Sequence, residues 1–309
     1  MQYSLSSKIA PIKEQVNEYI NGFKNYFHTH NLYNIIGHRI GDYKHYPKNL
    51  NDAKDIHKYK DIVAMIDHAF LNQGLTGIEL DLRQWNNNHI CVVHDTIRKN
   101  VSSQGEEYIV KNSLENVLTH FIEKGYYKHK KLFIEIKVSG KFFRFKDKTF
   151  FPDYVSKEER HFIGSVFSST EEIILKYPDK QQIRNSINFI SFSLAALHYA
   201  YRSGDENYAL YLILSTNQFM KKFLSRFFSY IPLTEAEKLR IQYSEWLKGL
   251  WFDPYYLQNP VETLQEINSQ RKNKLELFIS TYGMDPQKLL EKFKGKDKLE
   301  IHGVIFECE

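Results

Sequence analysis

The residues best suited to chemistry stand inside runs that otherwise have the composition of buried strands. Glu79 and Asp81 are two residues apart in the segment GIELDL, and side chains at that spacing point to the same face of a strand. Two exposed acids on a half-buried strand would show the same alternation. A buried carboxylate, in contrast, needs a cation or hydrogen bonds to offset its lost hydration. The neighbours of these two acids therefore decide between the two interpretations.

A histidine at the end of the next apolar run supplies one such neighbour. Asn87 and Asn88 suit a two-residue hairpin turn, because asparagine tolerates the positive φ that such turns require. With that turn, the register places His94 opposite Asp81, and directly opposed residues project from the same face of a hairpin. A shift of one residue would separate them, so the predicted grouping of Glu79, Asp81 and His94 depends on this register.

Two further strand ends carry the same kinds of side chain. His38 and Arg39 close the run YNIIGHR, and Glu135 and Lys137 are two residues apart in KLFIEIKV. In barrels of alternating strands and helices, the chemistry lies at the carboxyl ends of the strands. We therefore expect three carboxylates, two histidines, an arginine and a lysine to converge on one mouth.

This set of side chains is typical of a metal site that acts on an anion. Three carboxylates so close together cannot all remain ionised without a counter-ion, and oxygen ligands favour Mg²⁺ or Ca²⁺ over zinc. Glu79, Asp81 and Glu135 are therefore the candidate ligands of one divalent cation. The two histidines suit general acid and general base roles, and the arginine and lysine add positive charge. Phosphoryl chemistry fits this combination best.

Elements that could position these residues alternate along the chain. Eight short apolar runs separated by segments of helical periodicity predict a (β/α)8 TIM barrel. A doubly wound open sheet is the alternative, which the lack of GxGxxG and Walker sequences disfavours. The expected strands are 33–38, 77–82, 131–138, 188–193, 209–215, 249–253, 275–281 and 302–307, and the expected helices include 61–74, 113–125, 158–177 and 285–295. The run 89–94 follows the second strand too closely for a helical crossover, so it must form a β-hairpin extension.

Length and composition are those of a globular protein. The chain has 309 residues, of which 42% are hydrophobic and 26% charged, which is typical of folded rather than disordered chains. We interpret 1–309 as a single TIM-barrel domain, with 1–32 as an N-terminal helical extension packed on the barrel. The sequence has neither a signal-peptide pattern nor an apolar stretch of about 20 residues, so we expect a cytoplasmic protein or one exported by a route that needs no such signal.

Charge and cysteine content narrow the classes of partner. The net charge of +5 comes from 42 basic and 37 acidic residues, an excess that favours an anionic substrate. Like charges never form a block of five or more, so nucleic acid is not an expected partner. Cys91 and Cys308 form no CxxC motif, which disfavours a disulfide scaffold and a cysteine-bound zinc. The oligomeric state stays open.

The motifs together resemble those of one known family. The segments GHR, IELDLRQWNNNHICVVHD, FIEIK and GVIFE resemble the glycerophosphodiester phosphodiesterases, within the phospholipase C-like phosphodiesterase superfamily. The resemblance spans about residues 33 to 307 and implies a TIM barrel. The roles that it implies are ligation of one divalent cation by Glu79, Asp81 and Glu135, acid/base catalysis by His38 and His94, and phosphate contact by Arg39 and Lys137.

The reaction implied by this resemblance splits a phosphodiester into a phosphomonoester and an alcohol. The expected substrate is a small-molecule or lysolipid phosphodiester. A phospholipase C/D-type enzyme acting on lysolipid, sphingomyelin or phosphoinositide headgroups is the alternative within the superfamily. A catalytically silent barrel that binds a phosphorylated ligand is the alternative from another class. Neither the headgroup nor the division of acid and base roles between the two histidines follows from the residues.

Departures from the family pattern fall on the substrate side. The glycine that usually follows His-Arg is Ile40 here, and 41–60 is a long basic and aromatic insertion in place of a Pro-Glu-Asn segment. A Trp-Thr pair near the seventh strand is replaced by 280–282, which reads Ser-Thr-Tyr. The aromatic and basic segment 141–148 is interpreted as an ordinary loop or extra hairpin, and 218–231 as a barrel-packing helix. Peripheral contact with a membrane is the alternative for both segments.

Overall fold

Eight parallel strands close into a barrel in the computed structural model, which describes residues 34–51, 53–86, 89–138, 155–203, 207–214, 235–252, 260–280 and 301–306. The barrel order is β1-β9-β8-β7-β6-β5-β4-β2, and β1 also pairs with β2. The strands are β1 Asn34–Gly37, β2 Gly77–Trp85, β3 His89–Val92, β4 Lys131–Ile136, β5 Ile187–Ser191, β6 Ala209–Leu214, β7 Gly249–Phe252, β8 Glu276–Ser280 and β9 Gly303–Phe306. The predicted TIM barrel is confirmed, and the closure excludes an open sheet.

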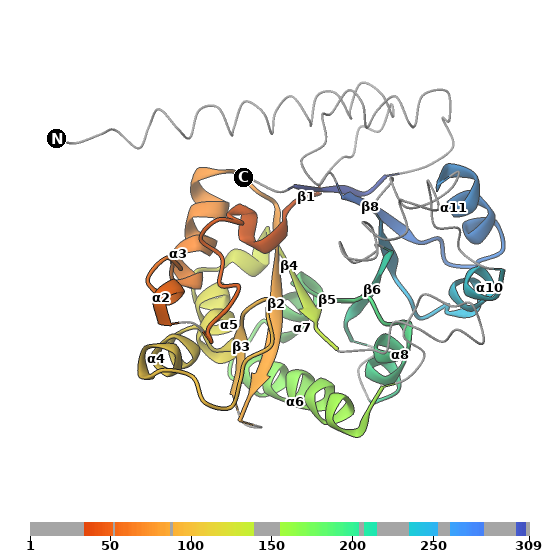
Figure 1. Cartoon of the computed structure of the whole chain (residues 1–309). Coiled ribbons are helices and arrows are strands. Elements are labelled where there is room, and N and C mark those ends of the chain that lie inside the picture. The colour runs from red at the N-terminus through yellow and green to blue at the C-terminus, as the bar shows by residue number, and fades with distance from the viewer. Residues whose placement is uncertain are drawn as a thin grey trace, which may run out of the picture.

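Helices surround this barrel on the outside (Figure 1). They are α2 Ala53–Ile56, α3 Ile62–Asp67, α4 Ser103–Lys111, α5 Leu114–Glu123, α6 Lys157–Ile174, α7 Lys180–Ser186, α8 Leu194–Arg202, α10 Glu235–Tyr243 and α11 Pro260–Ser269, with short helical turns η1 His38–Gly41, η2 His68–Asn72 and η3 Tyr126–Lys128. The helices expected within 61–74, 113–125 and 158–177 are present. The helix expected at 285–295 lies outside the described residues, as do 1–32, 141–148 and 218–231.

Local signals in the sequence explain where several helices begin. Ser113 caps α5, because its hydroxyl accepts a hydrogen bond from the Asn116 backbone N–H. At α6, the hydroxyl of Ser156 accepts from the Glu159 N–H and the Glu159 carboxylate accepts from the Ser156 N–H. This capping box satisfies two backbone donors that have no partner within the helix.

The core has two layers, one outside and one inside the sheet. Outward side chains of the strands pack against the helices and form the larger layer. Inside the barrel, aromatic rings fill the space in edge-to-face contacts, with centroids 5.4 Å apart for Tyr211 and Phe278 and 5.6 Å for Phe133 and Tyr211. The lumen is therefore a packed core rather than a pore, as expected for an eight-stranded barrel.

The closure of the barrel depends more on one neighbour of β1 than on the other. Four residue pairs join β1 to β9, from Asn34 with Gly303 to Gly37 with Phe306. Two pairs join β1 to β2. β1 is consequently held in the barrel more by β9 than by β2.

The predicted β-hairpin extension is present, but its predicted register is wrong by one residue. Trp85 pairs with His89 and Leu82 with Val92, which leaves three residues, 86–88, in the connection. Asn86 adopts a positive φ of 49°, and Asn87 and Asn88 lie outside the described residues. Continued by this register, Val93 rather than His94 stands opposite Asp81. The connection is thus longer than the two-residue turn that we inferred from the asparagines.

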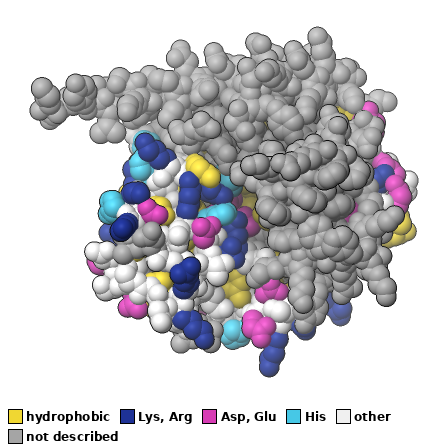
Figure 2. All heavy atoms as spheres, in the orientation of Figure 1, with side chains coloured by type: hydrophobic (Ala, Val, Ile, Leu, Met, Phe, Trp, Pro, Cys, Tyr) yellow, Lys and Arg dark blue, Asp and Glu magenta, His cyan; other side chains and the backbone are white. Residues whose placement is uncertain are grey.

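Figure 2 shows one face of the molecule in the same orientation. Lysine, arginine, histidine and acidic side chains are interspersed over the described part of this face, where Figure 1 places α2, α3 and α4. None of the described helices combines the length and hydropathy needed to cross a membrane.

Candidate active site

Three buried carboxylates meet at the carboxyl ends of β2 and β4. Asp81 and Glu135 are directly paired between the two parallel strands, and Glu79 points into the barrel one strand period earlier on β2. One oxygen from each of the three lies within 4.8 Å of the others. Each side chain is almost completely buried. The structure thus brings together all three residues that the sequence indicated as metal ligands.

Lys137 supplies the nearest positive charge to this cluster. Its ammonium Nζ lies 2.8 Å from Asp81 Oδ1 and 3.1 Å from Glu135 Oε2. Burial alone would lower the pKa of Lys137, but the charges of the two carboxylates outweigh burial and raise it. The lysine therefore stays protonated and offsets part of the negative charge.

The positive charges of the chain offset the negative charge of the cluster only in part. Burial raises the pKa of Glu135, and although Lys137 opposes this, the pKa reaches about 7. Burial also raises the pKa of Glu79 well above its ordinary value, with Asp81 and Glu135 adding to the effect. Burial has the same tendency at Asp81, but Lys137 and other positive charges outweigh it and hold the pKa well below its usual range.

A divalent cation fits this donor set. Glu79 Oε1 is buried and accepts no hydrogen bond from the part of the chain that the structure describes, which is costly for an ionised oxygen. Hard oxygen ligands clustered in this way suit Mg²⁺ or Ca²⁺. A bound cation would also hold Glu79 and Glu135 in their ionised forms, because an adjacent positive charge lowers the pKa of a carboxyl group.

The turn η1 places His38 and Arg39 beside the cluster. The Arg39 backbone N–H donates to Glu79 Oε2 over 2.8 Å, and its guanidinium Nε lies 3.8 Å from Asp81 Oδ2. The Nε2 atom of His38 lies 3.8 Å from Glu79 Oε2. Both residues therefore border the carboxylates, as the sequence indicated.

Three consecutive residues of η1 have left-handed backbone conformations. Arg39, Ile40 and Gly41 have φ values of 48°, 60° and 71°. A β-branched residue in this region costs roughly 1–2 kcal/mol, so the glycine common in the resembled family is the unstrained choice at Ile40. Ile40 is instead fully buried in the core, and its packing offsets the strain. The turn therefore forms with an isoleucine at this position.

His94 reaches the same region by a route that the sequence did not reveal. The backbone N–H of His94 donates to Pro47 O, and that of Asp95 donates to Lys48 O, each over 2.9 Å. Burial and the charge of Lys137 lower the pKa of His94 to about 4, while Asp81 opposes them. The imidazole is therefore neutral at pH 7, with its Nδ1 atom 2.6 Å from Asp95 Oδ1.

The insertion at 41–60 contributes residues that sequence reasoning missed. The fully buried Tyr46 accepts a hydrogen bond at its hydroxyl from the Asp81 backbone N–H, over 2.7 Å. Outside it, the ring of Tyr43 lies between two cations, with Arg39 Cζ at 4.5 Å and Lys48 Nζ at 3.4 Å from its centroid. The aromatic and basic composition of the insertion was the available signal, but its partners are distant in sequence.

Comparison with solved structures finds the same architecture in other proteins. A protein from Galdieria sulphuraria designated a glycerophosphodiester phosphodiesterase has a TM-score of 0.52 at 15% identity, covering 89% of this chain and 93% of that chain. One from Silicibacter pomeroyi DSS-3, designated a glycerophosphoryl diester phosphodiesterase, has a TM-score of 0.55 at 10% identity, covering 89% and 90%. A third with that designation, from Agrobacterium tumefaciens, has a TM-score of 0.50 at 12% identity, covering 89% and 93%.

Sequence comparison adds no relative to these three. No protein-family model matches the chain, and no curated protein matches it. At identities of 10–15%, the likeness concerns the fold. This chain therefore shares the TIM-barrel fold of those three proteins.

Proposed function

We propose that this protein is a metal-dependent phosphodiesterase that hydrolyses glycerophosphodiester-like substrates to a phosphomonoester and an alcohol. The observation that carries the proposal is the buried cluster of Glu79, Asp81 and Glu135 within 4.8 Å, bordered by two histidines, an arginine and a lysine. The designations of the three solved structures of the same fold support the substrate class. A small-molecule or lysolipid phosphodiester is the proposed partner, and nucleic acid is not.

The proposed cofactor is one Mg²⁺ or Ca²⁺ ion held by the three carboxylates. When bound, it would supply positive charge to a non-bridging phosphate oxygen and so stabilise the charge that builds up during the reaction. Arg39 and Lys137 border the same carboxylates. Their positive charges would attract the phosphate and orient it, since charge-assisted hydrogen bonds to phosphate are short and directional.

The two histidines would move the protons of the hydrolysis. One accepts a proton from the attacking oxygen as its bond to phosphorus forms, and the other donates a proton to the alcohol oxygen as the second bond breaks. His94 is neutral at pH 7 because its pKa is about 4. Its Nδ1 atom is engaged by Asp95, so Nε2 is the atom available for proton transfer.

A substrate panel tests this proposal. Hydrolysis of glycerophosphocholine, glycerophosphoinositol and a lysophosphatidylcholine would be measured with Mg²⁺, with Ca²⁺ and with EDTA. We expect turnover that needs the cation and that is lost in Glu79→Gln and His38→Ala. The matched control is Glu115→Gln, which alters an exposed glutamate 3.2 Å from Lys176 Nζ.

Two outcomes would overturn the proposal. Turnover that EDTA leaves unchanged, or that Glu79→Gln retains, would rule out the metal-dependent mechanism. Binding of every substrate without turnover would instead support the catalytically silent barrel. Preferential cleavage of the lysolipid would assign the protein to the lipid phosphodiesterases.

A further inference from the structure

The indole of Trp251 is a buried hydrogen-bond donor that lacks an acceptor. The side chain is 3% exposed, and its Nε1 atom has no hydrogen-bond partner within the residues that the structure describes. Buried tryptophan N–H groups usually find a partner, because a donor removed from water without an acceptor is costly. An unmet donor of this kind is available to an acceptor that the described part of the chain does not supply.

Trp251 lies in the wall of the barrel that faces the carboxylate cluster. In the barrel order, β7 is four strands from β2 in either direction, so Trp251 faces the strand of Glu79 and Asp81 across the lumen. Its ring makes edge-to-face contacts with Phe133, at a centroid distance of 6.2 Å, and with His38, at 6.4 Å. The indole therefore lies inside the barrel, in contact with one ring from the site and one from the packed lumen.

The other two tryptophans of the chain do not share this property. The Nε1–H of Trp85 donates to Arg98 O over 3.2 Å. Trp246 is only half-buried, and its ring stacks on His198 and Tyr201 with interplanar angles of 14° and 18°. They provide internal controls for any measurement on Trp251.

We propose that the Trp251 indole N–H donates a hydrogen bond to a phosphoryl oxygen of the bound substrate. This inference rests on the proposed function and adds a substrate-binding residue to it. On its His38 side, the indole borders the charged groups of the site. On its other sides, it packs against apolar residues such as Ile213 and Phe278. A neutral donor in such a dry environment binds an anionic oxygen without adding a buried charge.

The position beside His38 gives this hydrogen bond a consequence for the chemistry. The hydrogen bond from Trp251 would hold one phosphoryl oxygen next to the His38 ring. Arg39 and Lys137, which lie beside the carboxylates, would contact the other phosphoryl oxygens. Phosphorus is then oriented from two opposite walls of the barrel. Orientation of this kind lowers the activation free energy of the hydrolysis, because the entropy of aligning the reacting atoms is lost on binding rather than in the transition state.

Nuclear magnetic resonance of the indole groups tests the binding directly. The full chain, labelled with ¹⁵N-tryptophan and supplied with Mg²⁺ or Ca²⁺, gives three indole signals, which Trp85→Phe, Trp246→Phe and Trp251→Phe assign. We expect inorganic phosphate, and then glycerol 3-phosphate, to move the Trp251 N–H signal downfield to saturation while the Trp85 and Trp246 signals stay in place. An unmoved Trp251 signal overturns the inference.

Kinetics provide the second measurement. Trp251→Phe keeps the ring and removes the donor, so we expect kcat/KM to fall about 10- to 100-fold, the range for a lost hydrogen bond to a charged group. Trp246→Phe should leave kcat/KM unchanged. Full activity of Trp251→Phe overturns the inference, and a melting temperature within the range of the control variant excludes loss of folding as the cause.

The two measurements separate this inference from the proposed function. A saturable shift of the Trp251 signal in a protein that hydrolyses none of the substrates would retain the phosphate site and reject the phosphodiesterase. Metal-dependent turnover with an unmoved Trp251 signal would retain the phosphodiesterase and reject the role of Trp251.

Discussion

Both ends of the barrel hold carboxylates next to lysines, but the surroundings differ: the three at the mouth are almost completely buried, whereas the side chain of Glu276 at the other end is 27% exposed. At the amino ends of the strands, Glu276 Oε2 accepts a hydrogen bond from the Tyr211 hydroxyl over 2.6 Å, and Oε1 lies 2.9 Å from Lys248 Nζ. Both oxygens of that carboxylate are satisfied. At the mouth, three carboxylates share the nearby cations, and Glu79 Oε1 has no donor among the described residues. A carboxylate whose oxygens both have partners within the chain needs no ligand. A buried carboxylate oxygen without a partner is a candidate to bind one.

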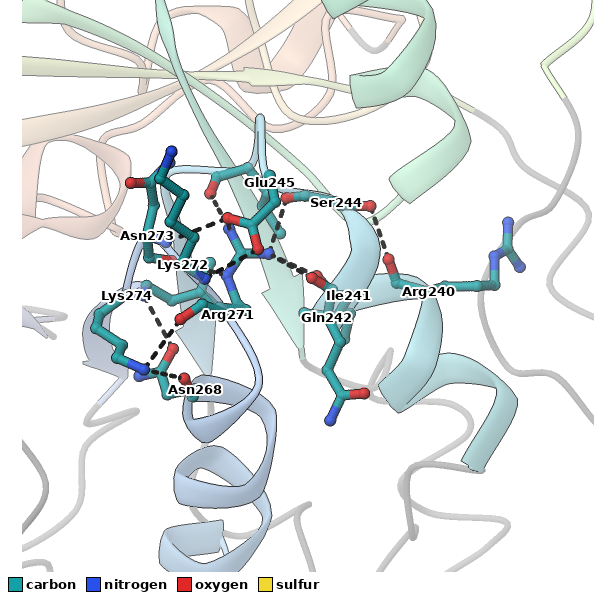
Figure 3. A network of polar contacts seen from close by, with 12 residues as sticks. Arg240, Ile241, Gln242, Ser244, Glu245, Asn268, Arg271, Lys272, Asn273 and Lys274 are labelled. Atoms are coloured by element: carbon teal, nitrogen blue, oxygen red, sulfur yellow. Dashed lines mark hydrogen bonds and ion pairs between the residues drawn. The ribbon is translucent and has the colours of Figure 1, made fainter.

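A buried arginine shows the same completeness at the amino ends of the strands. Arg271, which is 3% exposed, donates to the backbone carbonyls of Ile241, Ser244 and Leu247 over 2.6–2.9 Å. Figure 3 shows how this guanidinium joins the end of α10 and the residues after it to the segment before β8. The network lies between structural segments and leaves the arginine no free capacity for a ligand. The presence of a buried charged group therefore does not by itself indicate a functional site. The indication comes from a buried polar atom, such as Glu79 Oε1, whose hydrogen-bond partners are missing among the described residues.

Glu79→Gln should have the largest effect on activity and should not lower stability. We expect kcat/KM to fall about 1,000-fold, because a ligand charge worth several kcal/mol is lost from the cation site. The melting temperature of the metal-free protein should not fall, since one of three mutually repelling carboxylates is removed. Steady-state kinetics and thermal melting check both parts. Glu276→Gln is the matched control, for which we expect a lower melting temperature and an unchanged kcat/KM. Equal losses of melting temperature in the two variants would contradict the contrast between the two ends of the barrel.

Arg271→Ala should have the largest effect on stability. Five backbone carbonyls lose a charged donor, those of Ile241, Gln242, Ser244, Leu247 and Asn273. We therefore expect the free energy of unfolding to fall by about 3 kcal/mol. Chemical denaturation measures this change, and kcat at a temperature where the variant is folded should equal that of the native chain. Lys272→Ala, at the exposed neighbouring position, should change neither quantity. A loss of kcat in folded Arg271→Ala would show that the two ends are coupled.

The stability of the metal-free protein should depend on pH through the carboxylates at the mouth. Burial raises the pKa of Glu135 from 4.5 to about 7. A raised pKa in the folded state means that the contribution of Glu135 to stability is complete below about pH 4.5 and is lost as the pH rises through 7. The metal-free protein should therefore lose this contribution between pH 5 and pH 8.

A bound cation should reverse this loss. At 100 times its dissociation constant, Mg²⁺ or Ca²⁺ should add about 2.7 kcal/mol to the free energy of unfolding at pH 8. The same cation concentration should have much less effect at pH 5, where protons compete for Glu79 and Glu135. Melting curves at both pH values with EDTA or cation check this. Equal stabilisation at both pH values would contradict the assignment of these carboxylates as ligands.

Tyr211→Phe should have the smallest effect of the series. The variant removes one hydrogen bond to Glu276 and leaves the pairing with Lys248, so we expect a loss of about 1–2 kcal/mol in the free energy of unfolding. Tyr243→Phe serves as the control because Tyr243 is 81% exposed. A loss in Tyr211→Phe as small as in this control would mean that the hydrogen bond at the amino ends contributes nothing measurable.

Much of the fold could be predicted because barrel strands are buried on both faces. Each of the eight strands lies within or overlaps an apolar run of the sequence, and the charges of Glu79, Asp81 and Glu135 interrupt those runs at their carboxyl ends. Parallel pairing of neighbouring strands then brings such residues together without further information. The carboxylate cluster is thus a consequence of topology that periodicity alone can indicate.

The register of the hairpin could not be predicted in the same way. The asparagines at 86–88 suit both a two-residue and a three-residue connection, and the two differ by one residue in every pair. His94 nevertheless reaches the site. Val93 still donates its backbone N–H to Asp81 O, and only His94 and Asp95 turn away to donate to the carbonyls of residues 47 and 48. That partner is distant in sequence. Tyr46 and Trp251 escaped prediction for the same reason, since their roles depend on contacts across the barrel.

The unequal pairing of β1 gives the site an order of assembly in time. Glu79, Asp81, Glu135 and Lys137 come from adjacent strands and can meet as soon as β4 docks on β2. His38 and Arg39 follow β1, whose main partner is β9, the last strand of the barrel. The ladder between β1 and β9 joins the first barrel strand to the last, and the loop-closure entropy of such a long-range pairing must be paid before its contacts form. We therefore expect the three carboxylates to meet before His38 and Arg39 settle beside them, so that the proposed cation could bind before a substrate can be turned over.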